Sequence, residues 1–312
     1  MKNDPIEAAI TALDDIDPLT PEGKKQLGKA LGAKSNLVAA KAARIAGDAL
    51  LLDLIPNLTA AFEKFLAKGS GADKGCMAQL AIARALVKLD CVDADLFRRG
   101  MKHIQMEGTW GGTEDRAAEL RATCATGLAN THDPHALRDL VCLLVDPEWP
   151  ARAGAVRAIA AIGSEASTLL LRYKALAGDR EPDVVSQCVT ALLEIEGAAA
   201  LPLAIQLADA GDQETREAAI VALGISRRPD AIETLKQKFG NTADRDTKKC
   251  ILLALASSRI EPALEFLLEI IAGESISVAE LAISALSVVK DDLRVREAVK
   301  HAAQSRGDAL RI

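Results

Sequence analysis

A short helical phrase returns along the chain and constrains its fold more than any other sequence feature. The phrase reads small-x-x-Ala-Leu-small, with clear copies at 124–129, 158–163, 219–224, 251–256 and 282–287. The large apolar residues that mark the copies are Ile45, Leu86, Leu128, Ile162, Leu192, Leu223, Leu255 and Leu286. By subtraction, these markers are 41 or 42 residues apart up to Leu128 and 30 to 34 apart afterwards. A regular period of this size is typical of stacked repeats.

A second amphipathic pattern follows each marker. In seven of the eight copies an apolar residue lies nine positions after the marker, and in the eighth it slips by one. From Leu264 the pattern continues through Leu267, Leu268 and Ile271, a spacing that places all four on one stripe of a helix. Prolines such as Pro229 and Pro262 suit the first turn of these second helices. We therefore predict repeats of helix, tight turn and helix, stacked as an all-α solenoid of about eight pairs.

The same pattern predicts the domain organisation. Residues 1–33 read as N-terminal capping helices, residues 34–304 as the repeat solenoid and residues 305–312 as a C-terminal tail. Capping helices are expected because the end of a repeat stack needs a polar outer face.

Composition narrows the environment and the classes of partner. Apolar residues make up 49% of the chain but aromatic residues only 3%, so Ala, Leu, Ile and Val must fill the interior. A net charge of −6 argues against nucleic acid as a partner, because gripping phosphate backbones needs an excess of Lys and Arg. The first residues lack the apolar stretch of a signal peptide, and no run approaches 18 apolar residues, so we expect a cytoplasmic protein without a membrane span.

The six cysteines are predicted to be reduced core residues. They never occur as a CxxC pair, and most lie within apolar helical stretches.

The repeat resembles a known family. The segment 146–163, which reads Asp-Pro-Glu-Trp-Pro-Ala-Arg and ends in Ala-Ile-Ala-Ala-Ile-Gly, is similar to the short bacterial HEAT repeat, including the HEAT-like repeats of phycobilisome lyases. A basic residue seven positions before the marker, at Arg121, Arg216 and Lys248, matches the usual Arg of that family. The resemblance covers about residues 34–304. Tetratricopeptide repeats are the main rival, but their Trp, Gly-Tyr and late Pro positions are not reproduced.

The resemblance implies a right-handed α-solenoid in which first helices form the convex layer and second helices line a concave binding groove. Helical-wheel geometry then selects the second-helix residues that face away from the core. These candidate partner-binding residues are Arg98, Arg99, Lys102, His103, Asp139, Gln206, Gln237, Phe266 and Glu269. The run from Arg98 to His103 is the densest basic cluster and would suit an acidic peptide or a phosphate group. The alternative interpretation is a solvated helix face.

Two segments lengthen the first intervals and should project from the same edge of the stack. They are 68–75 and 106–112, and each follows a second helix. Trp110, flanked by glycine-rich sequence, is a candidate exposed anchor for a partner; the alternative is that it folds back over the stack. Trp149 lies at the start of a first helix and is expected to pack.

Sequence motifs for catalysis are missing. No GxxxxGK[ST], GxGxxG or GxSxG occurs, and Pro134 between His132 and His135 prevents the helical pairing that most two-histidine metal sites use. We therefore expect neither a cofactor nor a metal site.

The predicted function is a non-enzymatic scaffold that binds a protein or peptide partner on the concave face. The resemblance also implies two enzyme alternatives, a bilin lyase or isomerase and, less favoured by the acidic composition, a HEAT-like DNA glycosylase. Self-association into a homodimer through an end or edge of the stack is left open.

Overall fold

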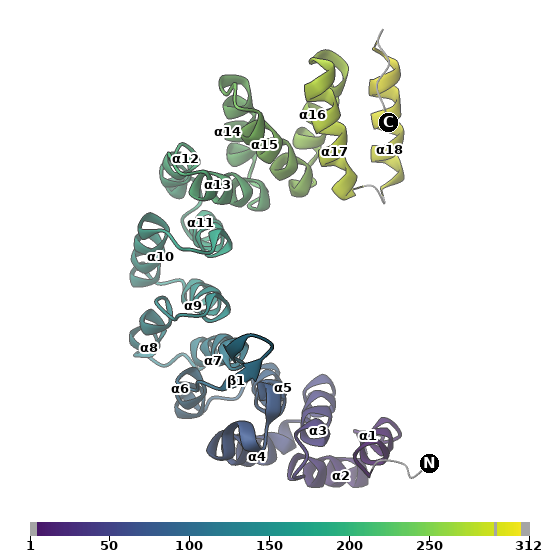
Figure 1. The fold of residues 1–312 in the computed structure, drawn as a ribbon, viewed down its shortest axis with the longest axis vertical. Helices are drawn as coiled ribbons and strands as arrows, with labels where there is room; N and C mark the ends of the chain where they lie inside the picture. Colours follow the sequence, from purple (N-terminus) through teal and green to yellow (C-terminus); the bar gives the residue numbers. More distant parts are fainter. Residues whose placement is uncertain (1–4, 290–291, 307–312) are drawn as a thin grey trace. The chain divides into compact units, whose positions relative to one another are not determined.

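The computed structural model describes residues 5–289 and 292–306, and these residues fall into two compact units, Met1–Ser167 and Thr168–Ile312 (Figure 1). Of the predicted tail 305–312, residues 307–312 lie outside the described residues. The helices of the first unit are α1 (Pro5–Asp14), α2 (Pro21–Leu31), α3 (Asn36–Asp48), α4 (Ile55–Lys68), α5 (Met77–Lys88), α6 (Ala94–Met101), α7 (Ala118–Asn130), α8 (Ala136–Leu143) and α9 (Trp149–Ile162). Helix α10 (Glu165–Ala177) begins in the first unit and continues into the second.

The second unit continues the same alternation of helices. Its helices are α11 (Pro182–Glu196), α12 (Leu201–Ala208), α13 (Gln213–Ile225), α14 (Pro229–Asn241), α15 (Arg245–Ser258), α16 (Glu261–Gly273), α17 (Ile276–Leu286) and α18 (Leu293–Gln304). Short 3₁₀ turns occupy Leu52–Leu54, Gly69–Gly71, Lys74–Cys76, Gly197–Ala200 and Ser287–Val289. The first unit also contains a β-hairpin of β1 (Met106–Thr109) and β2 (Gly112–Asp115), which the sequence did not predict.

The predicted repeat is confirmed as a helical solenoid architecture. Each of the eight marker residues falls on an odd-numbered helix, from Ile45 on α3 to Leu286 on α17. Six of the markers are buried, namely Leu86, Leu128, Leu192, Leu223, Leu255 and Leu286. Helices α13 and α15 begin as expected, because Asp212 and Asp244 accept hydrogen bonds from the backbone N–H groups of Thr215 (2.7 Å) and Thr247 (2.9 Å).

Small residues let the odd-numbered helices approach one another closely. A Cβ atom on Gly154 of α9 would lie 2.4 Å from the Cβ atom of Ala122 on α7. A Cβ atom on Gly224 of α13 would lie 2.4 Å from the carbonyl oxygen of Ala254 on α15, and one on Gly47 of α3 would lie 3.0 Å from the Cα atom of Ala85 on α5. Such backbone approach is open only to helices whose facing positions carry Gly or Ala.

This close approach decides which helices form the inner layer of each unit. The odd-numbered helices pack extensively on their odd-numbered neighbours, whereas α4, α6 and α8 contact one another little. Each unit therefore bends towards its odd-numbered helices, which lie on the inner side of the bend in Figure 1. The predicted assignment of layers was wrong: the second helices, which carry the nominated residues from Arg98 to Glu269, form the outer layer.

One apolar stretch of the described residues meets the length and composition of a membrane span. It is Pro182–Ala208, and 44% of its most apolar window is buried within the structure. The stretch is not one straight helix, because the 3₁₀ turn Gly197–Ala200 separates α11 from α12 and Gly197 has a φ of 62°. Apolar core helices pass the same test, so this feature is weak evidence for a membrane.

The cysteines described by the structure are free thiols. Cys76, Cys91, Cys124 and Cys188 are buried as predicted, Cys250 is half-buried and Cys142 is exposed on α8. Burial raises the pKa of the Cys76 and Cys188 thiols to about 12, so both remain protonated near neutral pH and serve packing.

The packing of α7 against α9 predicts the effect of one added methyl group. Gly154→Ala should destabilise the protein by about 1–3 kcal/mol, because its Cβ would overlap Ala122. Gly240→Ala on α14 is the matched control, since a Cβ there meets nothing within 4 Å, and it should stabilise by roughly 0.5 kcal/mol. Denaturant unfolding followed by circular dichroism measures both, and equal effects would contradict the close approach.

Candidate interaction surface

The basic cluster on α6 is largely neutralised by carboxylates. Arg98 donates from Nε to Asp139 on α8 (2.7 Å), and its Nη atoms reach Asp133 (3.0 Å) and Asp95 (3.1 Å). The Arg98 side chain is only 21% exposed. Because Arg98 lies on α6 and Asp139 on α8, their ion pair connects two neighbouring helix pairs. The hydrogen bond to Asp139 and then that to Asp133 raise the pKa of Arg98, which keeps its charge fixed. The structure thus brings the nominated Arg98 and Asp139 together, as an internal ion pair.

The other members of the cluster have separate roles. Arg99 forms an ion pair with Glu63 on α4, and His103 Nε2 lies 3.2 Å from Gln105 Oε1. Lys102 is exposed and makes no ion pair with the described residues. It lines a cleft of about 280 Å³ together with Arg98, Met101, Ile104, Arg121, Asp139, Cys142, Leu143 and Asp146. This cleft mixes charges of both signs with apolar side chains, so it does not select an anionic ligand.

The two lengthened segments, which were predicted to project from the same edge, contact each other. Asp73 is fully buried and accepts hydrogen bonds from the backbone N–H groups of Ala78 and Gln79, both at 2.9 Å. Gln105, before β1, donates from Nε2 to the carbonyl oxygen of Asp73 (2.8 Å). Glu107 on β1 accepts from the backbone N–H of Gly75 (2.7 Å). These bonds fix the base of the hairpin to the start of α5.

Arg121 joins the hairpin to the helical stack. It is 2% exposed, and its guanidinium pairs with Asp115 on β2 (2.6 Å) and with both carboxylate oxygens of Asp146 (2.8 Å each). Its Nη1 also donates to the carbonyl oxygen of His103 (2.9 Å). Burial by itself would lower the pKa of Arg121, but the hydrogen bonds to Asp146 and Asp115 outweigh it and raise the pKa. Arg121, which the sequence identified only by its match to the usual Arg of the HEAT-repeat family, is therefore the anchor of the hairpin.

Asp115 holds the other side of this anchor. Burial tends to raise its pKa, but hydrogen bonds from the backbone N–H groups of Gln105 and Ala117, followed by that from Arg121, bring the pKa below its usual value. The carboxylate therefore stays ionised near neutral pH and holds both the hairpin and Arg121 in place.

Trp110 lies at the tip of the hairpin and is fully exposed, at 105% relative accessibility. The turn consists of Trp110 and Gly111, and Gly111 has a φ of 107°, a conformation that favours glycine. The alternative in which Trp110 folds back over the stack is excluded. Trp149, in contrast, was expected to pack and is 46% exposed at the start of α9.

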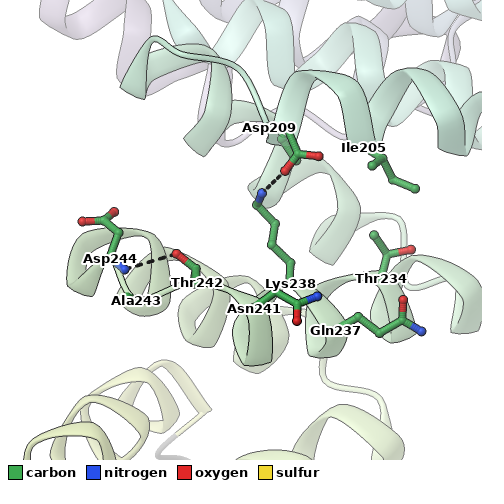
Figure 2. Close-up of a pocket in the computed structure, with 10 residues that line it drawn as sticks. Ile205, Asp209, Thr234, Gln237, Lys238, Asn241, Thr242, Ala243 and Asp244 are labelled. Carbon is green, nitrogen blue, oxygen red and sulfur yellow. Dashed lines mark hydrogen bonds and ion pairs between the residues drawn. The ribbon is translucent and has the colours of Figure 1, made fainter.

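The remaining nominated residues lie on the second unit. Gln237 lines a cleft of about 590 Å³ between α12 and α14, and Gln206 is exposed on α12. Lys238 crosses this cleft to pair with Asp209, and Gln237 lies at the opposite end from Asp244 (Figure 2). Phe266 is half-buried because its ring packs edge-on against Phe239 at 5.7 Å, while Glu269 is exposed. The structure therefore does not unite all nominated residues in one site.

Helix α10 carries an exposed apolar stripe. Leu169, Tyr173 and Leu176 are 62%, 71% and 56% exposed and share one face of the helix. Within the described residues, no group of three or more His, Cys, Asp or Glu side chains is placed to hold a metal ion.

The comparisons with known proteins agree with the fold. Residues 169–256 match the family model of HEAT repeats, so the protein contains HEAT repeats, as the sequence resemblance predicted. No curated protein matches the sequence.

Similar solved structures include the complex of CpcE and CpcF of phycocyanin lyase from Nostoc sp. PCC7120, with 17% identity over 92% of this chain and 94% of that chain and a TM-score of 0.36. The Escherichia coli protein YibA is 16% identical over 94% of this chain and 99% of its own, with a TM-score of 0.47. Human deoxyhypusine hydroxylase in complex with glycerol is 17% identical over 82% and 91%, with a TM-score of 0.31. Likenesses this distant carry no function to this chain.

The buried ion pairs of Arg121 predict a large loss of stability on substitution. Arg121→Met should destabilise the protein by about 3 kcal/mol, because it leaves the Asp115 and Asp146 carboxylates buried without their partner. Arg84→Met removes an exposed pair with Glu119 (3.9 Å) and should change stability by less than about 0.5 kcal/mol. Denaturant unfolding compares the two variants, and a small effect of Arg121→Met would show that the hairpin is not held through this side chain.

The lowered pKa of Asp115 predicts a pH dependence. A carboxyl group with a depressed folded-state pKa contributes stability above its unfolded value, and that contribution is lost as pH falls through the folded value. Wild type should therefore exceed Asp115→Asn in stability at neutral pH, and the difference should vanish only below the ordinary value of 3.8. Unfolding titrations at decreasing pH test this, and a difference that disappears well above 3.8 would contradict it.

Proposed function

We propose that the protein is a non-enzymatic scaffold that binds a partner protein, and that the hairpin bearing Trp110 is its main contact. The observation that carries the proposal is the complete exposure of the Trp110 side chain at the tip of a well-anchored hairpin. Covering an exposed indole with another apolar surface is favourable, and Trp is one of the residues enriched among binding hot spots.

The anchoring of the hairpin supports this proposal. Asp73 and Arg121 are almost completely buried and hold the hairpin to α5 and α7 through charged hydrogen bonds. A contact residue presented on a fixed base loses little conformational entropy on binding, which favours affinity. Repeat solenoids offer such preformed surfaces in general.

The α6 cluster has a smaller part in the proposal than its sequence suggested. Because carboxylates already pair with Arg98 and Arg99, only Lys102 and the half-buried His103 remain to meet a partner. The proposed partner is therefore chosen mainly by apolar contact with Trp110 and not by an acidic charge.

Trp110→Ala tests the proposal. Affinity purification of the tagged protein from its native host, followed by mass spectrometry, should recover a stoichiometric partner with wild type and lose it with the variant. The dissociation constant of that partner should rise at least about tenfold, as expected for an aromatic hot spot. Melting temperature should not change, because the Trp110 ring is fully exposed.

Tyr173→Ala is the matched control, because it also removes an exposed aromatic ring but lies on α10. It should retain the partner. Equal binding of the partner by Trp110→Ala and wild type would overturn the proposal. A coloured eluate without a partner protein would favour the alternative function of a bilin lyase or isomerase, because bilins are coloured tetrapyrroles.

A further inference from the structure

The hairpin presents backbone hydrogen-bonding groups that it does not use. Its strands pair with the register Met106–Asp115, Glu107–Glu114, Gly108–Thr113 and Thr109–Gly112, closed by the two-residue turn Trp110–Gly111. In such a hairpin the residues that flank the turn bond to each other, and the next pair directs its N–H and C=O groups outward. Thr113 therefore points one donor and one acceptor away from β1, along the free edge of β2.

The residues at the turn end of β2 are exposed. On β1, the side chain of Glu107 accepts a hydrogen bond from the backbone N–H of Gly75 in the 3₁₀ turn Lys74–Cys76. Gly112, Thr113 and Glu114 of β2 are all exposed, and Glu114 forms an ion pair with Arg116 (3.0 Å). A Cβ atom on Gly112 would meet nothing within 4 Å, so the space beside this residue is open.

The edge lacks some of the features that block strand pairing. Natural edge strands are protected by short length, by charged side chains such as Lys, by Pro, by a bulge or by a covering element. β2 is short and carries Glu114 and Asp115, but the other features are missing from the hairpin. Residues 106–115 contain neither Lys nor Pro, and the register of the two strands is regular. An open edge beside an exposed Trp110 is thus suited to accept a further strand.

We infer that β2 recognises its partner by β-strand addition: an extended segment of the partner protein pairs with the edge at Thr113 and covers Trp110 with an apolar side chain. This mode of recognition rests on the proposed function and specifies how the hairpin performs it. Backbone bonds supply part of the affinity in strand addition, and alternate side chains supply the specificity.

Charge indicates the chemistry of that segment. The hairpin carries Glu107, Glu114 and Asp115 and no Lys or Arg between residues 106 and 115. Pairing β2 with a second copy of itself would bring like charges together, which is unfavourable across strands. Asp115 is already paired with the buried Arg121, whereas Glu114 is 56% exposed and pairs with Arg116 only at the surface. A partner segment with a Lys or Arg next to its apolar residue therefore complements Glu114.

The test uses peptides selected from a phage-displayed random library on the immobilised full-length protein. Selected peptides should combine apolar with basic residues, and Trp110→Ala should abolish their binding. Thr113→Pro removes the outward N–H but keeps the bonds within the hairpin, because proline is tolerated at this position of an edge strand. It should weaken binding about tenfold, whereas the control Thr113→Val, which keeps the N–H, should bind as wild type.

A second measurement distinguishes strand addition from other modes. N-methylation of successive peptide bonds in a selected peptide should weaken binding at alternate positions only, because every second N–H of a strand faces its neighbour. Equal binding of the Thr113→Pro and Thr113→Val variants, or no alternation with N-methylation, overturns strand addition. If Trp110→Ala still abolishes binding in that case, the proposed function stands; if it has no effect either, both fail.

Discussion

Helices can approach one another closely only where their facing residues are small, and this constraint underlies the rest of the structure. The odd-numbered helices of each unit meet through pairs such as Gly154–Ala122 and Gly224–Ala254, where one added Cβ would overlap its neighbour. The helices α4, α6 and α8 on the other layer contact one another little. The difference between the two layers makes each unit bend, and it gives the odd-numbered helices the inner face.

Buried charge then fixes what the stack displays. Arg121 reaches from α7 to the hairpin through Asp115 and to the turn before α9 through Asp146. Asp73 holds the preceding insertion to the start of α5 and receives Gln105 from the hairpin side. Since removal of one partner would leave the others buried and unpaired, the two insertions and the stack should behave as one body. The exposed Trp110 owes its fixed position to these contacts.

The repeat itself could be predicted from the sequence because it is local. A marker such as Leu128 lies in the same helix as the small residues around it, and its period alone places the helices. The layers could not be predicted in this way, because the pattern shows which stripe of a helix is buried but not how far apart neighbouring repeats stand. The abundance of Ala and Gly on the marker helices was the available signal, and the family resemblance pointed the other way.

The geometry of the candidate interaction surface was predicted in part. The exposure of Trp110 and the shared edge of the two insertions follow from local composition and repeat position, and the structure shows both. The neutralisation of Arg98 could not be predicted, because Asp133 and Asp139 come from the next repeat and meet it only after folding. The hairpin was missed because its strands are short, although Thr109 and Thr113 on either side of Trp-Gly-Gly were a usable signal.

Amide hydrogen exchange of the full-length protein measures whether the hairpin that presents Trp110 is held rigidly. We expect the N–H groups of Gly75, Ala78 and Gln105, which donate to buried or half-buried carboxylates, to be as protected as the cores of α5 and α7, while the turn at Trp110 and Gly111 exchanges freely. Free exchange throughout residues 105–116 would show instead that the hairpin is a mobile loop without a fixed binding edge.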